Sequence, residues 1–329
     1  MKNKKVLITG AGGFIGSHLT ESLVNHAGSV RALVHYNSRG DQGLLYKLDE
    51  EVYQAIEVIA SDVRDPASVY NMMKDIDIVF HLAALIGIPY SYYSPDSYVD
   101  TNIKGTLNVL NAARELEISK VIHTSTSEVY GTALFTPINE KHSLQAQSPY
   151  SATKIGADKI AESYYLSFGL PVVTVRPFNT YGPRQSLRAV IPTIITQALM
   201  CDKVRLGNVD TVRDFNYVKD TVQGFLKAAS SDNSCGKTIN LGTETGVTIY
   251  QVVELVGKIL EKELIVEQQS ERLRPDTSEV YKLICDATLA RDLINWQPEY
   301  SLEEGLVETI QWFKHNSGHL KDQCRSYNL

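Results

Sequence analysis

Val6-Leu-Ile-Thr9-Gly10-Ala-Gly-Gly13-Phe14-Ile15-Gly16 joins a short apolar run to a glycine-rich turn. Leu19 and Leu23 follow at helical spacing, so the turn lies between an expected strand and an expected helix. Glycines there let a pyrophosphate approach the backbone, while the amides and dipole of the helix N-terminus stabilise its charge. The strand-to-helix context favours a dinucleotide site over a plain tight turn. The predicted cofactor contacts in this stretch are Gly10, Gly13, Phe14, Ile15 and Gly16.

Short apolar runs alternate with amphipathic stretches through the first half of the chain. Strands are expected at 5–9, 29–34, 56–60, 76–81, 120–125 and 172–176, and helices at 19–26, 67–74 and 103–117. Such alternation predicts an α/β fold with a doubly wound parallel sheet of the Rossmann type, covered by helices on both faces.

The regular alternation fades after Pro177. We therefore expect a dinucleotide-binding domain over 1–176, to which 216–242 returns with a helix at 216–229 and a strand at 238–241. A smaller, discontinuous α/β lobe over 177–215 and 243–320 should bind the substrate, and 321–329 should form a polar tail.

The composition excludes several classes of function. The chain has 329 residues, 43% of them hydrophobic, which is enough for a large core without metals or disulfides. A net charge of -6 argues against nucleic-acid and anionic-membrane partners, which require concentrated Lys and Arg. The apolar run after Met1 is too short for a signal peptide. The four cysteines are far apart and fit no zinc pattern, so we expect a cytoplasmic protein without a metal: Cys201, Cys235, Cys285 and Cys324.

Ser148-Pro-Tyr150-Ser-Ala-Thr-Lys154 predicts a capped helix that places a phenol and an ammonium one turn apart. A phenol with a pKa of about 10 is a poor base, but an adjacent ammonium and a cationic nicotinamide ring favour the phenolate. Tyr150 could then deprotonate a substrate hydroxyl while hydride leaves the same carbon. A surface Tyr and Lys would be the simpler interpretation in isolation. Together with the glycine turn and Thr124-Ser-Thr126, the catalytic one is favoured.

These motifs resemble those of the extended short-chain dehydrogenases/reductases, the family of NAD-dependent epimerases and dehydratases, over nearly the whole chain. The resemblance implies that Asp62-Val63 meets the adenine and that Asn102 supports the active site. Asp62 could instead cap the helix that is expected to begin near Pro66. His81 could be a histidine at the end of a strand whose hydrogen bonds are made within the protein. The cofactor contacts predicted outside the glycine turn are His35, Ser38, Arg39, Asp62, Val63, Leu82, Ala83, Ala84, Asn102, Thr124, Tyr150 and Lys154.

The segment Thr126-Ser127-Glu128 indicates the reaction, because 4,6-dehydration needs a carboxylate beside the threonine. Oxidation at carbon 4 acidifies the proton on carbon 5; a base removes it, the carbon 6 hydroxyl leaves as water, and hydride returns to carbon 6. The segment resembles the Thr-Ser-Glu of GDP-mannose 4,6-dehydratases. Ser127 replaces the aspartate of dTDP-glucose 4,6-dehydratases, so the acid can be Glu128, a water or another residue. Glu128 could also be only a solvated loop residue or a salt-bridge partner.

The resemblance places a nucleotide sugar in the second lobe. Arg213 and Arg274 resemble residues that clamp its diphosphate, and Asn179 would bond the same group. The loops 85–93 and 184–192 look most like those of dehydratases of legionaminic acid biosynthesis, which implies UDP- or GDP-N-acetylglucosamine as substrate. The predicted substrate contacts are Ile86, Tyr90, Thr126, Asn179, Arg184, Arg188, Val190, Arg213 and Arg274.

The second strand runs into His35-Tyr36-Asn37-Ser38-Arg39 without the acidic residue that usually bonds an NAD ribose. Ser38 and Arg39 could receive a 2′-phosphate, so NADP is slightly favoured over NAD. Either form should stay tightly bound, because hydride is removed and returned within one turnover.

Three other functions stay open. A UDP-glucuronate decarboxylase shares the Thr-Ser-Glu and Tyr-Lys motifs, a 4-epimerase is disfavoured by Glu128, and a non-catalytic NAD(P)-binding regulator is disfavoured by the retained catalytic residues. The resemblance also implies a homodimer formed through the Tyr150 helix and its neighbour near 102–114. The apolar residues around the Tyr150 helix are Ile155, Ala157, Ile160, Ala161 and Tyr164.

Overall fold

The computed structural model describes residues 1–316, so the predicted polar tail at 321–329 and the last four residues of the predicted lobe lie outside the described residues. Within 1–316, a seven-stranded parallel sheet has the order β11-β6-β5-β4-β1-β2-β3. Its strands are β1 (Lys5–Thr9), β2 (Ser29–His35), β3 (Ile56–Ser61), β4 (Ile78–His81), β5 (Lys120–Thr124), β6 (Val172–Pro177) and β11 (Thr238–Leu241). The strand order reverses between β1 and β4, the point where such sheets bind ligands.

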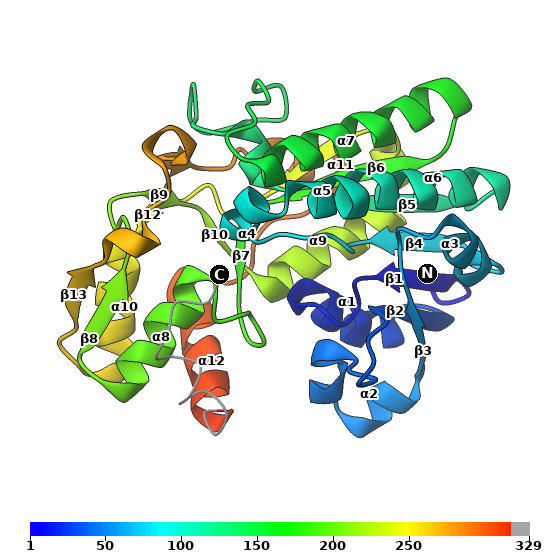
Figure 1. Ribbon diagram of the computed structural model, residues 1–329. Coiled ribbons are helices and arrows are strands. Elements are labelled where there is room, and N and C mark those ends of the chain that lie inside the picture. Colours follow the sequence, from blue (N-terminus) through cyan, green and yellow to red (C-terminus); the bar gives the residue numbers. More distant parts are fainter. Residues whose placement is uncertain (317–329) are drawn as a thin grey trace.

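Helices cover both faces of this sheet, as Figure 1 shows. One layer contains α3 (Pro66–Met73), α6 (Gly105–Glu115) and α7 (Pro149–Phe168), and the other contains α1 (Phe14–Val24), α9 (Val218–Ser230) and α11 (Thr288–Ile294). Val6 and Ile8 of β1 point into one hydrophobic core and Leu7 into the other. This alternation explains why the central strands are apolar throughout. The predicted doubly wound α/β fold is confirmed.

The second lobe packs three helices and small sheets of two or three short strands beside the carboxyl ends of the large sheet. Its helices are α8 (Val190–Met200), α10 (Ile249–Leu260) and α12 (Leu302–His315). Its strands are β7 (Asn179–Tyr181) with β10 (Phe215–Tyr217), β8 (Lys203–Leu206) with β13 (Ile265–Gln268), and β9 (Val212–Arg213) with β12 (Val247–Thr248) and β14 (Lys282–Leu283). Helix α11 falls within the predicted lobe but packs against α9 and β11. The domain boundaries therefore stay a prediction.

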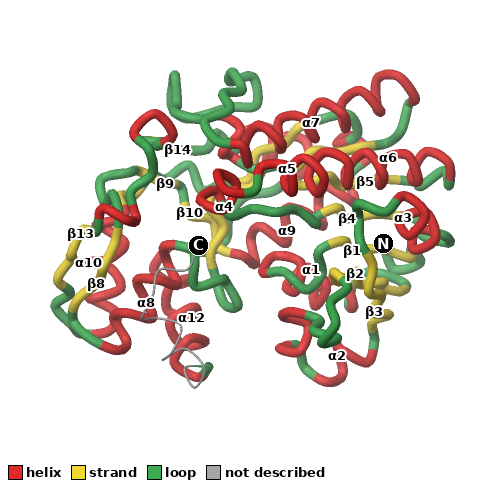
Figure 2. Tube along the Cα trace, viewed as in Figure 1, coloured by secondary structure: helices red, strands yellow, loops and turns green. Residues whose placement is uncertain are grey.

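Shorter elements complete the chain. Helices α2 (Glu50–Gln54), α4 (Ile88–Tyr93) and α5 (Pro95–Tyr98) precede a π-helical segment, Val99–Lys104, that runs directly into α6. Single 3-10 turns are Gly43–Lys47, Ser127–Tyr130, Asp232–Ser234, Ser270–Arg272 and Asp276–Ser278. Figure 2 shows that residues 131–148, between the turn at Ser127–Tyr130 and α7, are almost entirely loop. In the described part of the chain, no helix has the length and apolarity needed to cross a bilayer.

Some element boundaries differ from the predicted ones for local reasons. The helix expected at 19–26 begins already at Phe14, because Gly13 is its N-cap. The helix expected at 216–229 begins at Val218, because Phe215–Tyr217 forms a strand beside β7.

Candidate functional site

The glycine turn between β1 and α1 has space for backbone only. Gly10 has a φ of +74°, and a Cβ there would lie 2.8 Å from the amide nitrogen of Ala83. A Cβ on Gly16 would lie 2.1 Å from the carbonyl oxygen of Gly10. Gly13, the N-cap of α1, has no side chain to cap the first amides of the helix. These amides therefore face the end of the sheet, where they can bind phosphate oxygens.

Two further glycines, Gly12 in this turn and Gly43 in the loop after β2, were not predicted from the sequence. A Cβ on Gly12 would lie 2.7 Å from the carbonyl oxygen of Gln42, and one on Gly43 would lie 2.4 Å from that of Gly12. The loop after β2 therefore packs directly on the glycine turn, and the run Gly10 to Gly13 was the available signal for Gly12.

The end of β2 carries His35, whose side chain is 70% exposed and whose Nε2 lies 3.6 Å from Oδ2 of Asp62. Arg64 donates to both carboxylate oxygens of Asp62, and its hydrogen bond holds the pKa of Asp62 below the usual value. Asp62 does not cap the next helix: that alternative is wrong, because Asp65 accepts the cap hydrogen bond of α3. Ser38 and Arg39 are exposed in the following loop.

Asn37 orders that loop and was not singled out from the sequence. Its Oδ1 accepts hydrogen bonds from the backbone nitrogens of Arg39 at 3.1 Å and Asp41 at 3.0 Å. Asn37 therefore fixes the backbone at the position where a ribose or its 2′-phosphate is predicted to bind. An Asn in a loop of polar residues gives no sequence signal that separates this role from an ordinary turn.

His81 is the satisfied strand-end histidine of the alternative interpretation. Its Nδ1 lies 2.8 Å from Oγ1 of Thr9 and its Nε2 3.1 Å from Oγ1 of Thr106. The same Thr9 hydroxyl oxygen accepts from the backbone nitrogens of Leu82 and Ala83, both at 3.1 Å. These contacts fix the backbone of the segment that continues to Ala84, beside Gly10.

Asn102 joins the next loop to the catalytic helix. Its Oδ1 accepts from the backbone nitrogen of Leu85 at 2.8 Å, and its Nδ2 donates to the carbonyl oxygen of Leu85 and to Oγ1 of Thr153, each at 3.0 Å. Thr153 precedes Lys154, so this buried amide supports the helix that carries the predicted catalytic pair. Ile86 and Tyr90 follow on this loop and on α4, where they are 65% and 42% exposed.

Helix α7 places Tyr150 and Lys154 as predicted, one turn apart and both buried. Ser148 and Ser151 form a capping box, and Pro149 begins the helix. Burial raises the pKa of the Tyr150 phenol, whereas a hydrogen bond with Thr126 lowers it. Lys154 donates from Nζ to the carbonyl oxygen of Thr124 at 2.6 Å. The end of β5 and the first turn of α7 therefore form one polar cluster.

Glu128 follows this cluster on the turn Ser127–Tyr130. The hydroxyl oxygen of Thr126 accepts from the backbone nitrogen of Glu128 at 3.2 Å, and Ser127 is buried. The side chain of Glu128 is only 13% exposed, so it is not a solvated loop residue. Its negative charge also raises the pKa of Tyr150.

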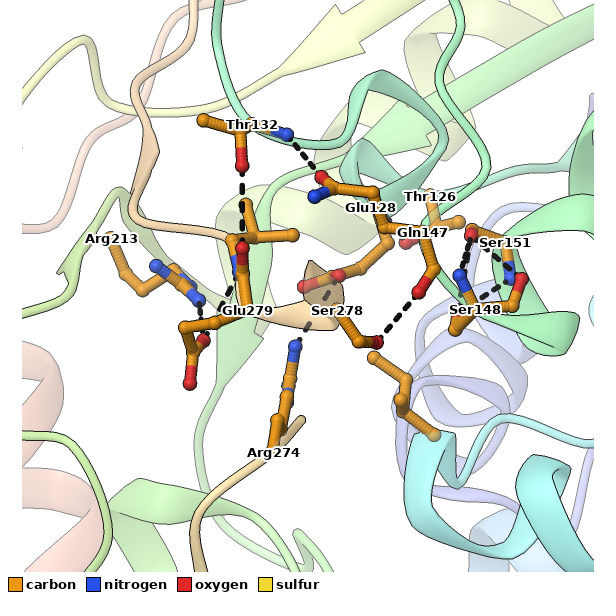
Figure 3. A network of polar contacts seen from close by, with 12 residues as sticks. Thr126, Glu128, Thr132, Gln147, Ser148, Ser151, Arg213, Arg274, Ser278 and Glu279 are labelled. Atoms are coloured by element: carbon orange, nitrogen blue, oxygen red, sulfur yellow. Dashed lines mark hydrogen bonds and ion pairs between the residues drawn. The ribbon is translucent and has the colours of Figure 1, made fainter. Parts of the chain in front are cut away.

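Two arginines of the second lobe meet two carboxylates at this site (Figure 3). Nη1 of Arg274 lies 3.7 Å from Oε2 of Glu128, and Nη2 of Arg213 lies 3.6 Å from Oε1 of Glu279. Burial lowers the pKa of Arg213, the charge of Glu128 raises it, and the charge of Arg274 lowers it. The two arginines that were predicted to clamp a diphosphate therefore lie at the site of the predicted base. Glu128 is also a salt-bridge partner, as one of the alternative interpretations predicted.

The remaining predicted substrate contacts are distributed differently. Arg184 contacts helix α1: its Nη2 lies 2.5 Å from Oε2 of Glu21. Arg188 lies just before helix α8, which begins at Val190. Among the described side chains, Oδ1 of Asn179 and Oγ1 of Thr124 are buried without a hydrogen-bond partner. Both atoms fit a site whose ligand supplies the missing partner.

Comparison with known proteins gives three kinds of sugar-nucleotide enzyme. The family model of GDP-mannose 4,6 dehydratase matches residues 7–309. The UDP-N-acetyl-alpha-D-glucosaminuronate decarboxylase of Bacillus cytotoxicus is 34% identical over 94% of this chain and 98% of its own.

Two solved structures share the fold along nearly their whole length. A UDP-N-acetylglucosamine 4-epimerase from Methanobrevibacter ruminantium, in complex with UDP-N-acetylmuramic acid, has a TM-score of 0.86 and 32% identity, covering 96% of this chain and 100% of that one. A dTDP-glucose 4,6-dehydratase from Streptomyces venezuelae, with NAD and TYD bound, has a TM-score of 0.86 and 25% identity, covering 95% and 98%.

Proposed function

Because this chain belongs to the NAD-dependent epimerase/dehydratase family of extended short-chain dehydrogenases/reductases, we propose that it is a nucleotide-sugar 4,6-dehydratase. Its relatives include decarboxylases, 4-epimerases and dehydratases of nucleotide sugars, which supports a nucleotide-sugar enzyme in general. The dehydratase assignment depends on one observation. Glu128 is a largely buried carboxylate on the turn that directly follows Thr126, and the Thr126 side chain hydrogen-bonds Tyr150.

In this proposal each side chain has a separate task. Thr126 orients the substrate, and Tyr150 takes the proton of the carbon 4 hydroxyl while Lys154 stabilises the phenolate by its charge. Glu128 then removes the carbon 5 proton, which the neighbouring carbonyl has made acidic. Ser127 is buried and is a hydroxyl rather than a carboxylic acid, so Glu128 is also placed to return its proton to the departing hydroxyl.

The residues at the glycine turn fit a nicotinamide dinucleotide. Gly10 and Gly16 leave room for backbone only, and the uncapped start of α1 suits a pyrophosphate. When bound, such a cofactor supplies a reversible hydride acceptor. Thr124, Tyr150 and Lys154 would hold its nicotinamide end, and Asp62 and Val63 the adenine end.

The form of the cofactor stays a prediction. Ser38 and Arg39 favour a 2′-phosphate and hence NADP, whereas the Streptomyces venezuelae dehydratase holds NAD. Tight binding follows from the return of the hydride within each turnover. Mass spectrometry of the nucleotide released from denatured protein identifies the form, and NAD alone would contradict the preference for NADP.

UDP- or GDP-N-acetylglucosamine is the proposed substrate. Its diphosphate would be bound by Arg213, Arg274 and Asn179. Decarboxylation of a nucleotide-linked uronic acid is the second candidate, because the 34% identical relative from Bacillus cytotoxicus has that activity. The products separate the two. NMR should show a 4-keto-6-deoxy sugar from either N-acetylglucosamine nucleotide. Carbon dioxide from a uronic acid nucleotide, without any dehydration, would replace this proposal with the second one.

Replacing the base tests the mechanism directly. Glu128→Gln keeps the side-chain shape and removes the charge, so dehydration should fall by at least about a hundredfold in the folded, cofactor-loaded protein. Incorporation of deuterium from heavy water at carbon 5 should fall with it. Glu162→Gln is a matched control, because Glu162 is exposed on α7 and forms an ion pair with Lys159. Undiminished dehydration by Glu128→Gln would refute the assignment.

We also propose a homodimer formed through α6 and α7. Ala157, Ala161 and Tyr164 are buried within the chain, so they serve the sheet rather than a partner. Ile155 and Ile160 are partly exposed, and Leu166 at the end of α7 is 73% exposed. Light scattering should give twice the mass of 36.6 kDa, and a monomer at working concentration would contradict it.

A further inference from the structure

Behind the predicted catalytic residues lies a buried charged cluster that the proposed reaction does not use. It comprises Asp158 on α7, His123 on β5, Ser125 just after β5, and Arg176 on β6. Each of the four is 4% exposed or less. Burying an ion pair costs free energy that hydrophobic residues of similar size would not, so its presence calls for a function other than stability.

Asp158 contacts the residues before and after Thr124, whose carbonyl oxygen accepts the hydrogen bond of Lys154. One carboxylate oxygen lies 2.9 Å from Nε2 of His123, and the other accepts from Oγ of Ser125 at 2.7 Å. Between them lies Thr124, whose carbonyl oxygen accepts from Nζ of Lys154 at 2.6 Å. Asp158 is also one helical turn after Lys154, so its negative charge favours the ammonium form.

Arg176 extends the cluster to the turn that carries the predicted base. Its Nε and Nη2 donate to Oδ2 of Asp158 at 3.1 and 2.8 Å, and its Nη1 donates to the phenol oxygen of Tyr130 at 3.0 Å. Tyr130 is the last residue of the turn Ser127–Tyr130 and donates to Oδ1 of Asn240 at 2.7 Å. One guanidinium group therefore links the helix of Tyr150 and Lys154 to the turn of Glu128.

We infer that Asp158 and Arg176 are positioning residues whose ion pair aligns the proton-transfer pair and the carbon 5 base at once. This inference builds on the proposed function, in which Tyr150 and Glu128 act on one substrate. A pair that touches both elements can align them without touching the substrate, because a small displacement of a catalytic group is enough to slow the reaction.

Several titratable groups surround Lys154 and belong to the test. Tyr150 and Asp158 share its helix, His81 comes from β4, His123 from β5 and Arg176 from β6. The rings of His81 and His123 are stacked with centroids 6.0 Å apart, and burial lowers the pKa of both. These histidines are therefore neutral near neutral pH, so the positive charges beside Asp158 are those of Lys154 and Arg176.

Asp158→Asn tests the inference on the cofactor-loaded protein. The amide keeps the shape and loses the charge, so hydride transfer should slow by about ten- to a hundredfold. The alkaline limb of its pH profile should move down by about one pH unit, because the ammonium loses its counter-charge. The measurement is the absorbance of the reduced nicotinamide after mixing with substrate. An unchanged rate and profile would overturn the inference.

Asp220→Asn is the matched control for a purely structural effect. Asp220 is 1% exposed on α9 and accepts from the backbone nitrogens of Glu299 at 2.9 Å and Tyr300 at 3.2 Å. This variant should lower stability without moving the pH profile.

If Asp158→Asn does not fold, Ser125→Ala removes one contact of Asp158 without a change of charge. It should still slow hydride transfer, and a wild-type rate in Ser125→Ala would overturn the inference.

Arg176→Lys separates the two arms of the cluster. A lysine keeps the positive charge but cannot bind Asp158 and Tyr130 with one planar group. Deuterium exchange at carbon 5 should therefore fall more than hydride transfer does, and an equal fall in both would contradict the link to the Glu128 turn.

Wild-type protein that reduces its nicotinamide but forms no 4-keto-6-deoxy sugar would refute the dehydratase proposal alone, since hydride transfer reports the positioning effect independently.

Discussion

Lys154 carries a positive charge in a nearly water-free position. Burial lowers the pKa of its ammonium to about 8, although the charge of Asp158 raises it. The protonated form stabilises the Tyr150 phenolate, so activity should be present below this pKa and fall as the pH rises through about 8. Turnover measured from about pH 6 to 10 should fall on the alkaline side with the slope expected for the loss of a single proton. Turnover that stays flat over this range would contradict the role of the ammonium.

Lys154→Arg is the matched variant for this pH dependence. An arginine keeps its proton throughout the range, so the alkaline limb should disappear even if the maximal rate is lower. A limb that persists at the same pH in Lys154→Arg would assign the titration to another group.

At the scale of single residues, the sequence identifies those sites whose members lie close together along the chain. Tyr150 and Lys154 share a helix, and Thr126 and Glu128 share a turn, so their spacing predicts their proximity. Arg184 shows the limit of this reasoning. Its pairing with Glu21 joins residues 163 positions apart, and no local pattern indicates which carboxylate an arginine will meet.

At the scale of elements, hydrophobic pattern and turn chemistry predict the sheet well. Strands β1 and β11 have the predicted bounds, and burial on both faces makes β1 a continuous apolar run between Lys5 and Thr9. The Asp158–Arg176 pair was missed because it joins a helix to a strand within the core. A buried charge has no periodic signature, and Arg176 looks like part of the apolar run of β6.

The segment 274–279, which we call the arginine strap, carries Arg274 and is fastened to the catalytic elements by Gln147 (Figure 3). The carbonyl oxygen of Gln147 accepts from Oγ of Ser278 at 2.6 Å, and its Nε2 donates to the carbonyl oxygen of Thr277 at 3.2 Å. Its Oε1 accepts from the backbone nitrogen of Thr132 at 2.5 Å. The side chain therefore joins the strap to the loop after Glu128.

Gln147→Ala should loosen the arginine strap and weaken binding of the diphosphate. We expect KM for the nucleotide sugar to rise by about tenfold with a smaller change in kcat, since the catalytic side chains remain. Steady-state kinetics with the dehydration substrate measures both. Gln54→Ala, an exposed change on α2 that removes a contact with Glu50, is the control. An unchanged KM in Gln147→Ala would show that the strap keeps its place without this amide.

At the scale of the whole molecule, the second lobe is fastened to the dinucleotide helix α1 behind the glycine turn. The carbonyl oxygen of Pro183 accepts from Nε2 of His18 at 2.9 Å, and Arg184 pairs with Glu21. Burial and the charge of Arg184 lower the pKa of His18 to about 4, so the ring is neutral at neutral pH and can still donate from its one N–H. Arg184 holds this contact with a φ of +67°, a conformation that residues other than glycine seldom adopt.

This tether should help to retain the cofactor, because the lobe packs against the helix whose first amides bind the pyrophosphate. Glu21→Gln removes the partner charge of Arg184, which is 10% exposed, and should increase the rate of nucleotide loss roughly tenfold. The nucleotide content of the protein after prolonged dialysis, compared with its initial content, measures this loss. Glu57→Gln removes an ion pair with Arg31 at the far edge of the sheet and should retain the nucleotide as the wild type does. Equal retention by Glu21→Gln and Glu57→Gln would show that the glycine turn alone holds the cofactor, and that the contact between the lobes serves only the fold.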